Sequence, residues 1–263
     1  MAFSSFGDWL GLLATTALAQ QLAGGDYAKA NFAIAGVFIA RLLPSVILGP
    51  LAGVIADKFD RKKVMVIGDI LRALLFISIP IVGNYFWLYT ATVLIECVTL
   101  FWSPAKDATM PNLIPKNKLE SANQMTLLAS YGSAPFAAIT FTLLTLFITG
   151  ISAAFNLGSN SAVDLALFIN ALSFLFSAWT ISQMDIPKEH LNKGDLSTSI
   201  FASLLDGGKF LSSSKVIRGL IFGFLGAFIA AGAVIGLART FVGDLGGGEA
   251  AYGVLFGAVF TGL

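Results

Sequence analysis

The residues in this sequence with the greatest chemical potential are charged side chains within or at the edge of long apolar stretches. A charge placed in hydrocarbon costs at least about 2.5–3.5 kcal/mol on insertion scales, so such residues usually face a cavity and have a partner. Acids and bases that occur together in the first four apolar stretches predict a charge network. The charged residues concerned are Asp8, Arg41, Asp69, Arg72, Glu96 and Asp164.

Asp8 and Glu96 are the candidates for a proton-carrying acid. Either could take up a proton in one conformation and release it in another, with Arg41 tuning its proton affinity and leaving it when the partners separate. The alternative is a static ion pair that fixes helix packing, and both interpretations stay open. Asp164 lies near the end of its stretch, where it could be solvated.

The composition indicates the setting of these residues. Of 263 residues, 56% are hydrophobic and 12% are charged, whereas a typical soluble domain has about 25% charged residues. This composition predicts a polytopic membrane protein. A single cysteine, Cys97, makes an intramolecular disulfide impossible, and a single histidine, His190, excludes a multi-histidine metal or haem site.

The sequence contains neither an ATP-binding signature nor a nucleophile–base pair. Gly246, Gly247 and Gly248 form a predicted turn and lack the lysine of a phosphate-binding loop. We therefore expect no enzyme activity, metal, cofactor or nucleic-acid partner, and energy from an ion or substrate gradient.

Eight apolar stretches have the character of membrane-spanning helices, which need about 20 residues. The final stretch has only about 14 residues, or ~21 Å of helix, so it is too short to span as given. The stretches are roughly 3–22, 30–56, 64–82, 85–102, 121–149, 161–182, 216–238 and 249 to the end.

Basic residues alternate between the connecting loops. Twelve Lys and Arg residues follow even-numbered stretches and two follow odd-numbered ones. By the positive-inside rule this predicts a cytoplasmic N-terminus. The long polar stretch 183–215 would then be cytoplasmic, and residues 200–211 form either an amphipathic helix on the membrane surface or a solvated loop.

The loop after the second stretch carries a recognisable motif. It resembles the loop 2–3 signature of the major facilitator superfamily, which is a glycine, three residues, an aspartate, a basic residue and a Gly-Arg-Lys-like cluster. Asp60 replaces the usual second glycine, which is similar to the branch that holds macrolide-efflux and enterobactin-exporter proteins. The motif residues are Gly49, Gly53, Asp57, Lys58, Arg61 and Lys62.

Three further stretches resemble the same branch, so the resemblance covers nearly the whole chain. They are Arg41-Leu42-Leu43-Pro44, Asp69-Ile70-Leu71-Arg72, and the segment 104–123 with its prolines. The resemblance implies an all-α fold of twelve helices in two halves joined by a cytoplasmic loop. The chain would hold a six-helix bundle (1–182), a linker (183–215) and the truncated start of the second bundle (216–263).

The resemblance also implies a role for the loop motif, which in the superfamily latches the outward-open state. Asp69 and Arg72 are three residues apart and share a helical face. There they could meet Asp57 and Arg61 in a gate network near the cytoplasmic end. The alternative is a basic cluster that only sets topology.

Two other features have both a functional and a packing interpretation. The segment from Gly132 to Ala138, with Pro135, loosely resembles an antiporter motif, but a proline among small residues also predicts a kinked packing helix. Asn170 could bind substrate or join helices by hydrogen bonds.

Taken together, these observations predict a secondary active exporter of the bacterial inner membrane. It would move amphipathic, drug- or macrolide-like small molecules outward against protons by alternating access, as a monomer in the lipid bilayer. A siderophore or lysophospholipid transporter of the same superfamily is one alternative. A non-transporting membrane scaffold or sensor is another.

Overall fold

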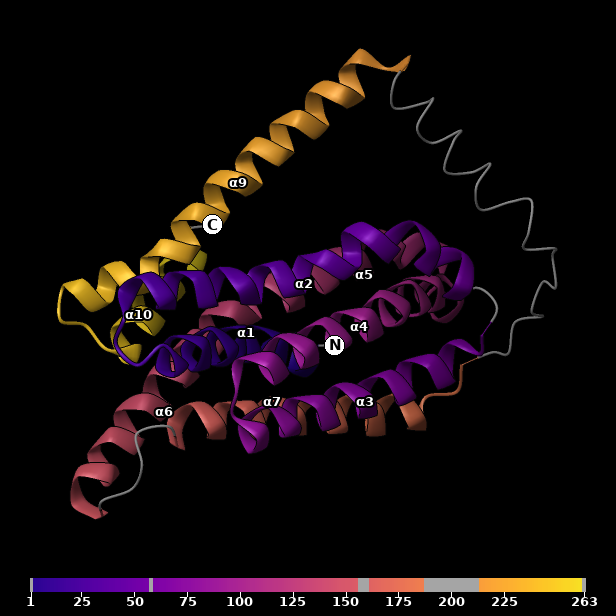
Figure 1. Cartoon of the computed structure of the whole chain (residues 1–263). Coiled ribbons are helices and arrows are strands. Elements are labelled where there is room, and N and C mark those ends of the chain that lie inside the picture. Colours follow the sequence, from indigo (N-terminus) through magenta and orange to yellow (C-terminus); the bar gives the residue numbers. More distant parts are fainter. Residues whose placement is uncertain (1, 57–58, 156–160, 187–212, 262–263) are drawn as a thin grey trace.

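The computed structural model describes residues 2–56, 59–155, 161–186 and 213–261. All regular structure in these ranges is helical, so the predicted all-α class is confirmed. The helices are arranged as shown in Figure 1. They are α1 (Ala2–Leu22), α2 (Tyr27–Ala56), α3 (Arg61–Val82), α4 (Tyr85–Leu113), the short 3₁₀ helix η1 (Lys116–Lys118), α5 (Leu119–Tyr131), α6 (Ser133–Phe155), α7 (Ser161–Gln183), α9 (Lys215–Asp244) and α10 (Glu249–Thr261).

Side-chain caps define where several helices begin. Asp60 precedes α3 and accepts a hydrogen bond from the Lys63 backbone N–H at 3.2 Å, so the residue that departs from the expected glycine caps this helix. Asn84 caps α4 in the same way through Trp87. Between these two helices Gly83 adopts φ 59°, a left-handed conformation that favours glycine.

An exposed acid starts α2. Asp26 accepts a hydrogen bond from the Lys29 backbone N–H at 3.0 Å, and this bond lowers the pKa of the Asp26 carboxyl. The Lys29 ammonium lies 3.3 Å from the same carboxylate. The cap and the ion pair stabilise the first turn after the α1–α2 connection.

Three predicted helix boundaries were wrong, and the seventh stretch, expected to end at residue 238, continues to Asp244 as α9. The fourth stretch was expected to end at residue 102, but α4 continues to Leu113 because Trp102, Ala105 and Thr109 keep a buried face at helical spacing. The predicted fifth stretch is divided at Gly132 into α5 and α6.

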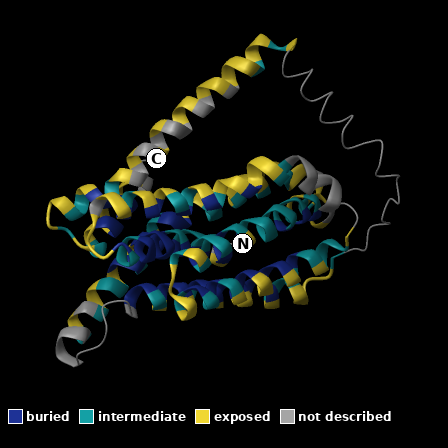
Figure 2. Cartoon of the chain, viewed as in Figure 1, coloured by how far each residue is buried: buried dark blue, intermediate teal, exposed yellow. Residues whose placement is uncertain are grey.

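The bundle is organised around α1. This helix packs against α2, α6 and α7, while α3 packs against α4 and α7, and α2 packs against α4. Its apolar side chains, among them Leu10, Leu13 and Ala17, are fully buried in the main core. Figure 2 shows this buried centre in dark blue.

The last two helices contact the bundle unequally. α10 packs against α6, and the end of α9 lies beside α2 and α10. Toward its first residue α9 runs away from the bundle, as Figure 1 shows, and Val216, Leu220 and Phe222 are exposed. The predicted amphipathic helix of residues 200–211 lies outside the described residues.

Five described stretches are long and apolar enough to cross a membrane. They are Ala28–Gly49, Arg61–Val82, Tyr85–Pro111, Leu119–Ile148 and Ala162–Gln183. α1 is not among them because Asp8 and its serines, threonines and glutamines lower its hydropathy. This helix is nevertheless the most enclosed part of the bundle.

Candidate functional site

An ion pair between two membrane-spanning helices is the centre of the predicted charge network. Arg41 of α2 and Glu96 of α4 lie with Nε 3.1 Å from Oε1, and their side chains are 25% and 15% exposed. Both residues are near the middle of their apolar spans. The structure therefore brings together two of the predicted coupling candidates at membrane depth.

Asp8 of α1 lies next to this pair without joining it. The charges of Arg72, Arg41, Asp69 and Lys106 all act on its carboxylate. Within the described part of the chain, the Asp8 side chain forms no ion pair or hydrogen bond, and it remains partly exposed. Asp8 is thus a partly exposed carboxylate on which the charges of both Arg41 and Arg72 act.

Asp69 and Arg72 of α3 form a second ion pair, which is completely buried. The Arg72 guanidinium also lies 4.5 Å from the Trp102 ring centre and 4.3 Å from that of Phe174. Cation–π contacts of this kind stabilise a desolvated arginine. This pair lies inside the bundle, joining α3 to α4 and α7.

The loop motif residues bind the ends of neighbouring helices. Arg61 Nη1 donates to the Ala108 carbonyl of α4 at 3.0 Å, and Lys62 Nζ donates to the Met184 carbonyl after α7 at 2.7 Å. Gly49 and Gly53 lie in the last turns of α2. Asp57 and Lys58 lie outside the described residues, so the predicted gate network stays a prediction.

Asn170 of α7 is fully buried against α1. A Cβ atom at Gly7 would lie 2.4 Å from Asn170 Oδ1, and one at Gly11 would lie 2.2 Å from Asn170 Nδ2. Glycines four residues apart on α1 therefore allow the two helices to approach closely. This geometry favours the packing interpretation of Asn170.

Gly132 and Pro135 lie at the break between α5 and α6. A proline cannot donate to the carbonyl one turn earlier, and its ring crowds that turn. Gly132 donates its backbone N–H to the Leu128 carbonyl at 2.8 Å, and a Cβ atom there would lie 2.4 Å from the same oxygen. The glycine thus accommodates the bend that the proline causes.

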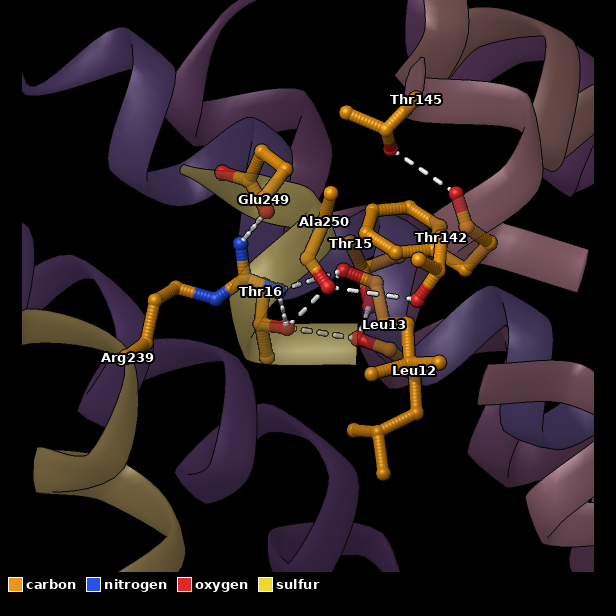
Figure 3. Close-up of polar contacts among 10 residues, drawn as sticks. Leu12, Leu13, Thr15, Thr16, Thr142, Thr145, Arg239, Glu249 and Ala250 are labelled. Atoms are coloured by element: carbon orange, nitrogen blue, oxygen red, sulfur yellow. Dashed lines mark hydrogen bonds and ion pairs between the residues drawn. The ribbon is translucent and has the colours of Figure 1, made fainter. Parts of the chain in front are cut away.

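A buried polar cluster formed by Arg239 and Glu249 was not predicted, and the predicted seventh stretch ended at residue 238. α9 continues to Asp244, so Arg239 is helical and only 2% exposed, and it forms an ion pair with Glu249 of α10. Its Nη2 donates to the Leu13 carbonyl at 3.1 Å and to Thr16 Oγ1 at 3.3 Å, both on α1. Figure 3 shows the guanidinium between these groups.

Two further contacts complete this cluster. The Arg239 guanidinium carbon lies 4.0 Å from the Tyr252 ring centre, and Thr142 of α6 donates to the Ala250 carbonyl at 3.3 Å (Figure 3). One signal could have identified Arg239, since it follows an apolar run with no intervening turn residue. Its partners on α1 are more than 220 positions away and have no signature in the sequence.

The described residues contain no group of three His, Cys, Asp or Glu side chains that could hold a metal ion. The arrangement brings carboxylates and arginines together in ion pairs, two of which join different helices. Its polar centres are Arg41 with Glu96, Asp69 with Arg72, and Arg239 with Glu249.

Comparison with known proteins identifies the family of this chain. The pattern of the major facilitator family described as transmembrane secretion effector matches residues 2–263. The chain belongs to this family. It is a multi-pass membrane protein with the major facilitator fold, and the family resemblance noted in the sequence is confirmed.

Relatives of this major facilitator chain are transporters. It is 29% identical over 217 residues to the uncharacterized MFS-type transporter YfiS of Bacillus subtilis, covering 81% of this chain and 48% of the relative. It is 26% identical to the putative bacilysin exporter BacE of Bacillus subtilis, covering 80% and 50%. It is 25% identical to the macrolide efflux protein A of Streptococcus pyogenes, covering 68% and 42%. The chain thus spans about half the length of these relatives.

Proposed function

We propose that this chain is the first part of a proton-coupled exporter of amphipathic small molecules in the bacterial inner membrane. Residues 1–182 form its first bundle, 183–215 a cytoplasmic linker and 216–263 the start of its second bundle. The N-terminus is cytoplasmic and the transporter acts as a monomer. The relatives named for macrolide efflux and bacilysin export support outward transport of small molecules.

The observation that carries this proposal is the Arg41–Glu96 ion pair with Asp8 beside it. A mostly buried pair at membrane depth is costly to desolvate, and a packed apolar contact of similar volume would stabilise the bundle as well or better. Its presence at membrane depth therefore supports a functional role. Protonation of Glu96 would free Arg41, and Asp8 offers the freed guanidinium a second carboxylate.

This partner exchange couples protons to helix position. Arg41 and Glu96 join α2 to α4, whereas an Arg41–Asp8 contact would join α2 to α1. A proton arriving at Glu96 thus weakens one helix contact and favours the other. Such a change can bias alternating access between two states.

The loop motif supports a latch at the cytoplasmic end. Arg61 and Lys62 bind carbonyl groups at the ends of α4 and α7, so movement of the α2–α3 connection is transmitted to both helices. Charge-assisted hydrogen bonds to carbonyl oxygens are stronger than neutral ones but can still exchange partners. This is the behaviour that a reversible latch needs.

The first test is accumulation in an efflux-deficient bacterial host that expresses the transporter containing this chain. We expect lower accumulation of macrolides or amphipathic dyes, and a protonophore should restore it. A panel that also contains siderophores and lysophospholipids separates the alternative substrates. Unchanged accumulation across the whole panel would refute export.

The second test uses reconstituted vesicles to separate coupling from transport. Glu96→Gln should abolish substrate uptake driven by a pH gradient but retain exchange of labelled for unlabelled substrate, which moves no net proton. Lys118→Gln, a charge change at an exposed position, should affect neither. If gradient-driven transport survives both Glu96→Gln and Asp8→Asn, the coupling assignment is wrong.

A further inference from the structure

A cavity lies at the end of the bundle where α4 ends and α3 begins, away from the Arg41–Glu96 pair. Its volume is about 650 Å³, and its walls come from α1, α3, α4, α5 and α7. In Figure 1 this is the right-hand end of the bundle. The size falls in the range of about 300–1,000 Å³ typical of small-molecule sites.

The walls are apolar and adaptable. Four methionines contribute to them, and Phe3, Trp102 and Phe176 add aromatic surface. Methionine side chains are flexible and polarizable, so surfaces rich in them accept apolar groups of different shapes. The methionines are Met65, Met110, Met125 and Met184.

One charged hydrogen-bond donor lines this apolar surface. Lys106 is the single charged side chain among the described lining residues, and its ammonium lies 5.7 Å from the Trp102 ring centre. Its carboxylate partner Asp107, 3.1 Å away, is 67% exposed and does not line the cavity. Trp102 Nε1 is buried and has no hydrogen-bond partner within the described residues.

The threonine hydroxyls of the wall have already used their protons. Thr109 donates to the Ala105 carbonyl at 2.7 Å, Thr126 donates to Ala122, and Thr180 donates to its own helix. The Ser177 hydroxyl is hydrogen-bonded to the Asp69 carboxylate. The donor left for a ligand is therefore Lys106, and no carboxylate among the described lining residues could attract a cation.

We propose that this cavity binds a single-tailed amphiphile with an anionic head. The apolar tail lies among the methionines, and the head accepts charge-assisted hydrogen bonds from Lys106 Nζ on α4. Binding at this site is independent of the proposed transport activity, because it needs neither a gradient nor the Arg41–Glu96 pair.

The cavity should prefer an anionic head because Lys106 is its charged donor. A charge-assisted hydrogen bond contributes enough to give about a tenfold or larger preference for an anion over a neutral head of the same size. An ammonium head meets Lys106 as a like charge. The order of affinity should therefore be anion, then neutral amide, then cation.

The test measures binding of three dansyl-labelled undecyl chains that end in a carboxylate, an amide or an ammonium group. The chain is held in phosphatidylcholine nanodiscs, and empty nanodiscs give the background. Lys106→Gln should lower carboxylate affinity about tenfold and leave amide affinity unchanged, while Lys106→Arg retains the preference.

Two controls distinguish a site from general charge or misfolding. Lys118→Gln makes the same charge change at an exposed position outside the cavity and should change nothing. Ala122→Phe should fill the cavity and reduce binding of all three probes, with the helical circular dichroism retained. Equal affinity for the ammonium and carboxylate probes, or a preference that survives Lys106→Gln, would overturn the proposal.

A final arm identifies the source of the anion. Nanodiscs that contain lysophosphatidylglycerol, a lipid with one tail and an anionic head, either displace the carboxylate probe, which supports a lipid as the natural occupant, or leave it bound, which supports a free amphiphile. Either result counts as support only if Lys106→Gln also lowers the affinity for the carboxylate probe.

Discussion

Replacing Glu249 by glutamine should loosen the attachment of α9 and α10 to α1. The change leaves the Arg239 guanidinium buried, at 2% exposure, without its ionic partner. Breaking a buried pair in this way costs about 3–5 kcal/mol because a desolvated charge stays uncompensated. We expect the lower end of this range, since Glu249 is 19% exposed and Arg239 keeps its hydrogen bonds to α1.

The fluorescence of Trp9 can report this attachment directly. Its ring centre lies 6.0 Å from that of Phe256 on α10, so undocking of α10 changes its environment. In a variant with Trp9 as the single tryptophan, unfolding by SDS in mixed micelles is followed by Trp9 fluorescence and by circular dichroism. Glu249→Gln should lower the free energy of unfolding obtained from the Trp9 fluorescence transition by about 3 kcal/mol.

An exposed ion pair provides the matched control. Lys29 and Asp26 are 74% and 43% exposed, so Asp26→Asn should have only a small effect on the free energy of unfolding. Added salt should reduce the loss of stability caused by Asp26→Asn. It should leave the loss caused by Glu249→Gln largely unchanged, because salt screens buried ion pairs only weakly. A Glu249→Gln shift no larger than the Asp26→Asn shift would refute the role assigned to the buried cluster.

Three further changes test the packing. Gly11→Ala places a methyl group against the buried amide of Asn170 on α7, so it should destabilise the bundle by about 1–3 kcal/mol in the same SDS titration. The control is Gly150→Ala, which has open space around it and should be neutral or stabilising. Asp69→Asn leaves the buried Arg72 unpaired and should cost about 3–5 kcal/mol; a cost below 1 kcal/mol would mean that the aromatic contacts alone stabilise the guanidinium. Asn84→Ala removes the cap of α4 and should cost about 1 kcal/mol, and an unchanged midpoint would show that water replaces the cap.

Much of the helical architecture could be predicted from hydropathy because lipid leaves few options. Backbone groups in hydrocarbon must be satisfied within their own segment, so a long apolar stretch becomes a helix. All eight predicted stretches are helical within the described residues. The errors lie at ends and breaks, at Leu113 and Gly132, where packing and a proline bend override hydropathy.

The partners of the charged residues were less predictable. The cost of burying a charge indicated that Arg41 needs a carboxylate partner. It did not decide whether that partner is Asp8 or Glu96. Packing of α2 on α4 places Glu96 within ion-pair distance, and Asp8 belongs to a different helix. The rotation of each helix about its axis depends on its neighbours, so it has no local signature.

By itself, the amino-acid sequence determined the membrane class, the helical segments, the loop motif and the family, because each depends on local composition or short spacing. The tertiary structure alone decided that Arg239 binds α1 and Glu249, that Gly7 and Gly11 admit Asn170, and that Lys106 and Trp102 share a cavity wall. These contacts join residues far apart in the chain. They arise only when whole helices pack, since packing selects which face of each helix is buried.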